Sequence, residues 1–200
     1  METMKDRAQS IMLIVLKDLT VTHTATSLAK GLEMSRWGIW KILKKLQEND
    51  LIVVEPIGSG KTSINRIRLN WENVLVEKTL ALFLTQEALK HKRWISNFAD
   101  LEKEVDFLIL YGSILYSPKE ARDIDIIGIT SNEKKFDKIG NIILKIQETQ
   151  IKKIHSINLT QKEFEKELKK PNKAFIDAIK KGVILFGQEK FIKFIKKLQT

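Results

Sequence analysis

The sequence predicts a chain of two domains, with mixed α+β and α/β character. Apolar residues recur at helical spacing through the first part of the chain, and two short runs with alternating polarity follow them. Beyond residue 105, short runs rich in Ile, Leu and Val alternate with amphipathic stretches, as expected where helices pack on a sheet. We therefore expect domains at 1–70 and 105–200, joined by a connecting helical segment at 71–104.

The first domain is expected to contain three helices and a hairpin. The first helix covers 8–18, with Leu19 just beyond it on the same apolar stripe. Thr26 or Ser27 caps a short second helix that ends at Leu32, and Ser35 caps a third helix that reaches about Asn49. Strands at 51–54 and 64–69, joined by a glycine-containing turn, complete the hairpin. The predicted inner face of the third helix consists of Ile39, Ile42, Leu43 and Leu46.

The second domain is expected to contain four strands with helices between them. In the connecting segment before it, Leu75, Leu80, Leu82, Phe83 and Leu89 predict a helix that packs against other elements. The predicted strands are 107–110, 124–129, 151–159 and 183–186. The predicted helices are 133–149, 161–169, 173–181 and a basic amphipathic helix at the end of the chain.

Composition narrows the class of protein. The 200 residues include no cysteine, which excludes disulfides and thiolate metal sites and fits a reducing cytoplasm. No apolar run approaches the roughly 18 residues needed to cross a bilayer, so we expect no membrane partner and a cytoplasmic location. The formal net charge is +10, and such an excess attracts polyanions.

One side of the predicted third helix is basic and carries an aromatic residue near its start. At 100° per residue, Trp37, Lys41, Lys44 and Lys45 lie away from the apolar inner face. The second and third helices with the hairpin resemble a winged helix-turn-helix over about residues 5–70. That resemblance implies DNA binding, with Arg36, Trp37 and Lys41 near bases and Lys44 and Lys45 near phosphates. In the wing, Lys61, Arg66 and Arg68 would reach the flanking backbone or the minor groove.

The same helix face has a second interpretation. Exposed lysines are common on solvated helices, and a winged helix can also serve protein contacts, with Trp37 and Trp40 as an interface patch. Both a DNA partner and a protein partner, including a second copy of the chain, therefore stay open.

The chemistry of the second domain is indicated by Gly112-Ser113 followed by Asp123 and Asp125. A hydrophobic strand leads into Gly112, and glycine lets backbone amides approach a phosphate. Asp123 and Asp125 lie two residues apart at the start of a strand, so both carboxylates face one side. Two carboxylates on one side suit a divalent cation that arrives with nucleotide phosphates.

This arrangement resembles the nucleotidyltransferase superfamily of polymerase-beta-like fold, over about residues 100–187. The resemblance implies a mixed sheet with flanking helices and nucleotide binding at Gly112 and Ser113. It also implies catalytic and metal-binding roles for Asp123 and Asp125, Mg²⁺ or Mn²⁺ as cofactor, and a nucleoside triphosphate as substrate or ligand. The implied reaction transfers a nucleotidyl group to a hydroxyl of nucleic acid or protein.

The sequence departs from that family where a third carboxylate is expected. The strand 151–159 contains no Asp or Glu, and its neutral candidates for the position are His155, Ser156 and Asn158. His155 and Asn158 are an odd number of residues apart, so only one of them can face the aspartates. Two functions stay open: a metal-dependent nucleotidyltransferase, and a DNA-binding transcriptional regulator with a catalytically degenerate transferase domain.

Overall fold

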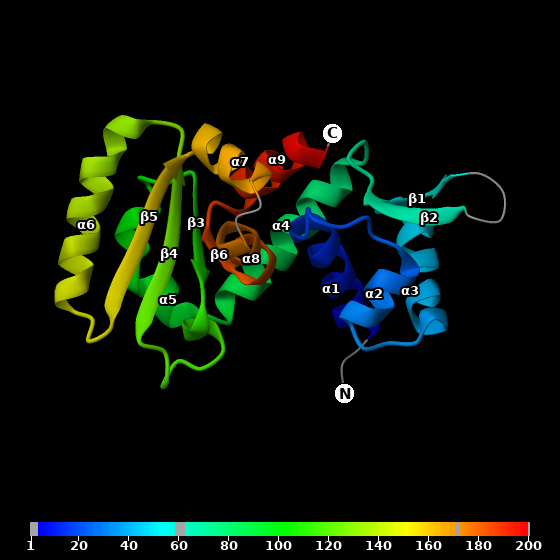
Figure 1. Cartoon of the computed structure of the whole chain (residues 1–200), viewed down its shortest axis with the longest axis horizontal. Coiled ribbons are helices and arrows are strands. Elements are labelled where there is room, and N and C mark those ends of the chain that lie inside the picture. Colours follow the sequence, from blue (N-terminus) through cyan, green and yellow to red (C-terminus); the bar gives the residue numbers. More distant parts are fainter. Residues whose placement is uncertain (1–3, 59–62, 171–172, 200) are drawn as a thin grey trace. The chain divides into compact units, whose positions relative to one another are not determined.

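A computed structural model describes residues 4–58, 63–170 and 173–199 (Figure 1). The chain divides into two compact units, Met1–Phe83 and Leu84–Thr200, and we describe each by itself. A two-stranded antiparallel sheet and a four-stranded mixed sheet are present among the described residues. The predicted mixture of helices and strands is confirmed.

The first unit contains three helices followed by a hairpin. Its elements are α1 (Met4–Lys17), α2 (Ala25–Gly31), α3 (Arg36–Glu48), β1 (Ile52–Ile57) and β2 (Ile64–Leu69). The first helix begins four residues earlier than predicted, because the polar turn from Met4 contains no residue that breaks a helix. This turn also places Asp6 at the N-terminus of the helix, where the helix dipole favours a negative charge. The strands pair from Ile52 with Leu69 to Ile57 with Ile64, as an antiparallel hairpin.

The helix caps show one prediction that was right and one that was wrong. Ser35 caps α3, and its side chain accepts a hydrogen bond from the Gly38 N–H at 3.1 Å. The cap of α2 is Thr24, not Thr26 or Ser27. Thr24 accepts from the Ser27 N–H at 3.1 Å, and the Ser27 hydroxyl accepts from the Thr24 N–H at 2.8 Å. This reciprocal pair satisfies two amides, which favours a start at Thr24.

The core of the first unit forms around α3. The predicted inner face of α3 is confirmed, because Ile39, Ile42, Leu43 and Leu46 are all buried. Helix α1 and strand β1 pack against α3, and β2 packs against α1. These elements contribute further buried residues: Ile11, Met12, Leu16, Ile52, Ile67 and Leu69. The opposite side of α3 is consequently left at the surface.

The segment predicted to be helical at 71–104 forms α4 (Val74–Leu89), α5 (Lys92–Asn97) and a 3₁₀ turn (Ala99–Leu101). Leu80 and Phe83 are buried as expected, whereas Leu75, Leu82 and Leu89 are exposed. Apolar residues lie on all sides of α4, so a helix that packs on one side leaves some of them at the surface. None of the helices in residues 4–58, 63–170 and 173–199 is long and apolar enough to cross a membrane.

The second unit is built on a four-stranded sheet of order β5-β4-β3-β6. β3 is antiparallel to both of its neighbours, and β4 is parallel to β5. The strands are β3 (Phe107–Tyr111), β4 (Asp123–Thr130), β5 (Lys153–Thr160) and β6 (Val183–Phe186). The helices are α6 (Phe136–Glu148), α7 (Gln161–Lys169), α8 (Lys173–Lys181) and α9 (Gln188–Gln199). Each predicted strand and helix of this unit is present, with ends shifted by a few residues.

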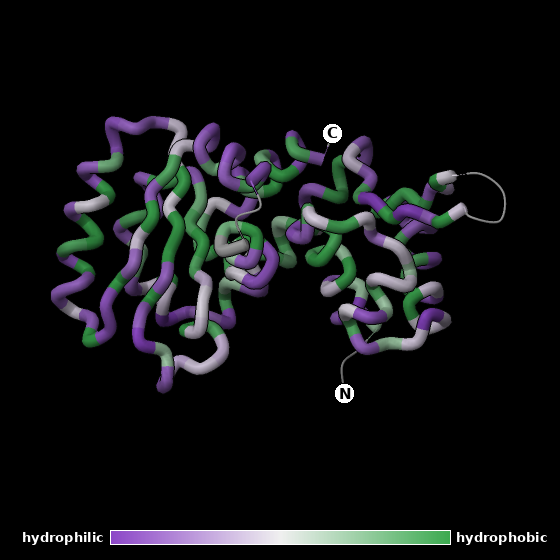
Figure 2. The backbone as a smooth tube through the Cα atoms, viewed as in Figure 1, coloured by the Kyte–Doolittle hydropathy of each residue, from purple (hydrophilic) through white to green (hydrophobic). Residues whose placement is uncertain are grey.

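Both faces of this sheet carry hydrophobic side chains. On one face, Leu108, Ile124 and Ile126 join a buried cluster with α5 and α6. On the other face, Phe107 contacts Phe164 of α7 at 6.2 Å and Phe191 of α9 at 5.5 Å between ring centroids. Figure 2 shows hydrophobic residues along the middle of the strands and hydrophilic ones where β4 and β5 begin. The polar site described below lies at that end.

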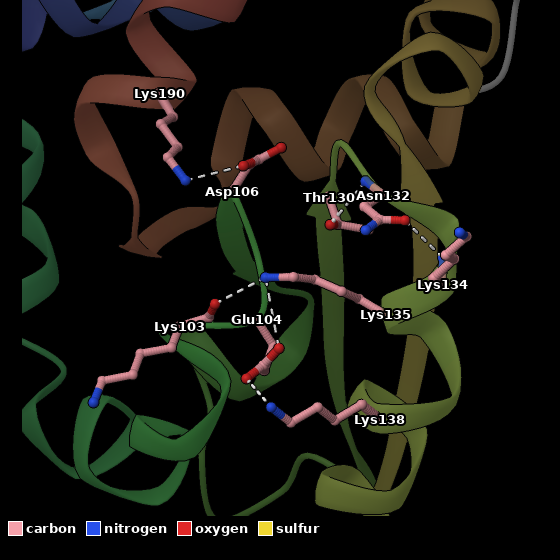
Figure 3. A network of polar contacts seen from close by, with 9 residues as sticks. All are labelled: Lys103, Glu104, Asp106, Thr130, Asn132, Lys134, Lys135, Lys138 and Lys190. Atoms are coloured by element: carbon pink, nitrogen blue, oxygen red, sulfur yellow. Dashed lines mark hydrogen bonds and ion pairs between the residues drawn. The ribbon is translucent and has the colours of Figure 1, made fainter.

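At the opposite end of the sheet, several lysines form a network of polar contacts with two carboxylates, those of Glu104 and Asp106 (Figure 3). Lys138 binds Glu104 at 2.5 Å and Lys135 lies 3.6 Å from it. Burial raises the pKa of Asp106, but hydrogen bonds from Lys190 and Gln161, both at 3.0 Å, outweigh it and leave that pKa below its ordinary value. These contacts tie the start of β3 to α6, α7 and α9.

Candidate functional site

The outer side of α3 carries the residues predicted to contact DNA. Arg36, Trp37, Lys41, Lys44 and Lys45 are all exposed. The Lys41 ammonium lies 3.4 Å from the centroid of the Trp37 ring, which is a cation–π contact. This contact holds the indole in place although 68% of the Trp37 residue is exposed.

The three lysines among these five residues line two different hollows. Trp37, Lys41 and Lys44 line a shallow hollow of about 390 Å³ together with Trp40 and Gln47. Lys45 lines a separate hollow of about 340 Å³ between α1 and α3. The helical angle alone does not show this separation, because it places Lys44 and Lys45 side by side without showing which neighbouring helix flanks each one.

The arginines predicted to act in the wing are paired within the hairpin. Arg66 donates a hydrogen bond to Glu55 at 3.1 Å, and Arg68 donates to the same carboxylate oxygen. The hydrogen bond from Arg68 lowers the pKa of Glu55, burial opposes this shift, and Arg66 adds to it. Lys61, the remaining residue predicted in the wing, lies outside the described residues. The pairing is explained by register, since Glu55 is directly opposite Arg66.

In the second unit, the turn after β3 brings Gly112 against Asp125. Gly112 has φ +83° and ψ −166°, a conformation that is strained for residues with a side chain. A Cβ added to Gly112 would lie 2.4 Å from Asp125 Oδ2. Ser113 is exposed and begins a single 3₁₀ turn, Ser113–Leu115. Only glycine at position 112 allows the chain to turn this close to the carboxylate.

Strand register places two more side chains beside Asp125. Tyr111 is opposite Asp125 on β3, and His155 is opposite it on β5. His155 Nδ1 lies 3.5 Å from Asp125 Oδ1 and 3.9 Å from Asp123 Oδ2. The site therefore consists of two carboxylates that face one side of the sheet, as predicted, with an imidazole between them.

The local environment affects two ionisable groups. Burial raises the pKa of the Asp125 carboxyl above its ordinary value, His155 opposes that shift, and the Asp123 carboxylate adds to it. Burial also raises the pKa of the Tyr111 hydroxyl, and the charge on Asp125 contributes. A bound cation would relieve the unfavourable negative charge at Asp125.

The neutral candidates for the third ligand position lie on two different faces of β5. His155 faces the aspartates, whereas Ser156 and Asn158 point to the opposite face of the sheet. There the Ser156 hydroxyl donates to Asn158 Oδ1 at 3.3 Å, and Asn158 lies against Gly128. Of the candidates that the sequence left open, His155 therefore lies beside the aspartates, and Ser156 and Asn158 do not. The sequence showed that the two sets face opposite ways, but it did not fix the register with β4 that decides between them.

Sequence reasoning missed two residues at this site. Lys153 is exposed and directly opposite Asp123, and Tyr111 lies across from Asp125. The signal for Lys153 was present, because it shares the alternation of His155 along the predicted strand. Its position beside Asp123 depends on the parallel register of β4 and β5, which the sequence does not state.

The donor set suits a cation that arrives with its ligand. In the described part of the chain, no group of three or more His, Cys, Asp and Glu side chains is arranged to hold a metal ion. Mg²⁺ is commonly bound by one or two protein carboxylates together with substrate phosphates, instead of a cage made only of protein groups. Asp123 and Asp125 fit that mode of binding.

Comparisons of the chain with protein families, with curated proteins and with solved structures found no match.

Proposed function

We propose that this chain is a winged-helix nucleic-acid-binding protein whose second unit is a nucleotidyltransferase-fold domain that binds a nucleoside triphosphate with Mg²⁺. The observation that carries the proposal is the close approach of Gly112 to Asp125, with Asp123 on the same side of the sheet. A glycine turn for phosphates thus meets a carboxylate pair for a cation. Mn²⁺ would serve in place of Mg²⁺.

Each residue has a distinct part in this proposal. The backbone amides of the Gly112-Ser113 turn and the Ser113 hydroxyl bind phosphate oxygens. Asp123 and Asp125 hold the cation, which neutralises phosphate charge and orients the triphosphate. His155 stands where a third carboxylate would assist activation of an attacking hydroxyl. An imidazole adds no negative charge to the site, so we expect slow or absent transfer to hydroxyls together with retained nucleotide binding.

The first unit supports the nucleic-acid part of the proposal. Three helices and an antiparallel hairpin follow in the order of a winged helix, and the exposed side of α3 carries one arginine, three lysines and Trp37. Positive charge along an exposed helix binds phosphates regardless of base sequence. With Arg66 and Arg68 paired to Glu55, α3 supplies most of the proposed contact.

A second function is favoured by the imidazole beside Asp125. A domain that has the glycine turn but no third carboxylate is suited to sensing a nucleotide. The chain would then be a DNA-binding transcriptional regulator with a catalytically degenerate transferase domain. The distance of 3.5 Å between His155 and Asp125 is the observation that favours this alternative.

Titration calorimetry with Mg-ATP tests nucleotide binding. The double variant Asp123→Ala/Asp125→Ala should abolish binding, and omission of Mg²⁺ should do the same for the wild-type protein. Asp137→Ala is the matched control, because Asp137 is an exposed aspartate on α6, outside the site. Binding that is independent of metal, or unchanged in the double variant, would refute the proposal.

Transfer of radiolabel from each ribonucleoside triphosphate to the protein, to RNA and to cell lysate separates the two functions. His155→Asp should raise transfer if the chain is an enzyme weakened by its missing carboxylate. No transfer by either protein favours the regulator. Robust wild-type turnover that Asp125→Ala abolishes would show that the domain is not degenerate.

A further inference from the structure

The shallow hollow on the outer side of α3 has a composition suited to an unpaired base. Its lining residues are two tryptophans, two lysines and one glutamine, so it combines flat apolar surfaces with positive charge. Lys44 has an acidic neighbour in Glu48, at 4.0 Å, but both side chains are more than half exposed. Such an exposed pair is weak and leaves the lysine able to meet a phosphate.

Trp37 is the exposed aromatic of this hollow. The Lys41 ammonium at 3.4 Å holds the ring from one side, while two thirds of the residue remains exposed. An indole fixed in this way loses little conformational entropy when a flat partner stacks on it.

A duplex offers this surface less than a single strand does. Paired bases are stacked on one another and expose only their edges in the grooves, so they cannot stack on a side chain. Unpaired bases stack on aromatic side chains with little dependence on sequence. The hairpin also offers little free positive charge to the second strand of a duplex, because Arg66 and Arg68 both pair with Glu55.

We propose that the outer side of α3 binds single-stranded nucleic acid, with an unpaired base stacked on Trp37 and the adjoining phosphates at Lys41 and Lys44. This inference rests on the proposed nucleic-acid binding and specifies the strandedness of the partner. Gln47, at the far end of the hollow, supplies an amide that can hydrogen bond to a neighbouring base.

Fluorescence anisotropy with the full chain tests the inference. The probes are a labelled thymidine oligonucleotide and the duplex formed with its complement, at equal low salt. The single strand should bind more tightly and should quench tryptophan fluorescence. Trp37→Leu should weaken single-strand binding roughly 10-fold to 100-fold, the size of one base–aromatic stacking interaction. Trp37→Phe should restore part of the affinity.

Tyr116→Leu is the matched control, because Tyr116 is an aromatic residue of the second unit with 67% exposure, against 68% for Trp37. It should leave single-strand binding unchanged. Equal affinity for duplex and single strand, or full affinity in Trp37→Leu, overturns the stacking inference while nucleic-acid binding stands. Binding of neither probe overturns the proposed nucleic-acid binding as well, and leaves the α3 surface to protein contacts.

Discussion

Replacement of Gly112 by alanine tests the geometry on which the proposed nucleotide site depends. The alanine must adopt φ +83° and ψ −166°, which costs a residue with a side chain about 1–3 kcal/mol. Its Cβ would also lie 2.4 Å from Asp125 Oδ2, well inside the 3.4 Å at which ordinary van der Waals contact begins. Rotation of Asp125 relieves this overlap only by moving the carboxylate. We therefore expect Gly112→Ala to lose about 1–3 kcal/mol of stability and most of its affinity for Mg-ATP.

Thermal unfolding and titration calorimetry measure these two effects separately. At about 4 °C per kcal/mol for a unit of this size, the melting temperature of the second unit should fall by roughly 4–12 °C. The same substitution at Gly140 is the control, since nothing lies within 4 Å of an added Cβ there. In α6, Gly140→Ala should raise stability by about 0.5–1 kcal/mol through helix propensity. Unchanged stability and unchanged Mg-ATP binding in Gly112→Ala would refute the reasoning.

Three further predictions follow from charge. Because the pKa of Asp125 is raised, its ionisation disfavours the folded state as the pH rises through the ordinary and then the raised pKa. Asp125→Asn should therefore raise the melting temperature at neutral pH and abolish Mg-ATP binding; a lower melting temperature would contradict this. The pKa of Asp106 is lowered, so its contribution is present at neutral pH and is lost as the pH falls. Asp106→Asn should cost about 1–3 kcal/mol at neutral pH, measured by denaturant unfolding, and much less in acid. Lys44→Ala and Lys45→Ala should each flatten the log–log salt dependence of nucleic-acid binding by roughly 0.9 for every phosphate that the lysine neutralises, and a slope identical to that of the wild-type protein would exclude such a role.

Much of the secondary structure could be predicted because each element carries its own local signal. The inner stripe of α3 and the strand at 64–69 are examples, since periodicity and turn residues define them without reference to the rest of the chain. The cap of α2 was misplaced because Thr24, Thr26 and Ser27 are all acceptable caps by type. Only the reciprocal bond between Thr24 and Ser27 selects among them.

The sequence singled out part of the candidate site, but not how its residues are brought together. Gly112, Asp123 and Asp125 stand out in the sequence because their residue types and spacing suggest phosphate and cation binding. His155 and Lys153 join them through the pairing of β4 with β5, which is a long-range property. The pairing of Arg66 and Arg68 with Glu55 is of the same kind, because the register of the hairpin, not the composition of either strand, brings the three together.

The backbone pairing of β3, β4 and β5 determines where the chain can accept insertions and substitutions. Tyr111, Asp125 and His155 are neighbours because three strands lie in fixed register, so their spacing does not depend on the path of the chain between β3 and β4. In that connection the Ser117 N–H donates to the Ser113 carbonyl at 2.8 Å, so the exposed residues 118–120 beyond it are where length or composition can differ while the distances at the aspartates are kept. A reporter group or an inserted peptide placed there would follow the Gly112-Ser113 turn in the chain without interrupting the pairing of the three strands.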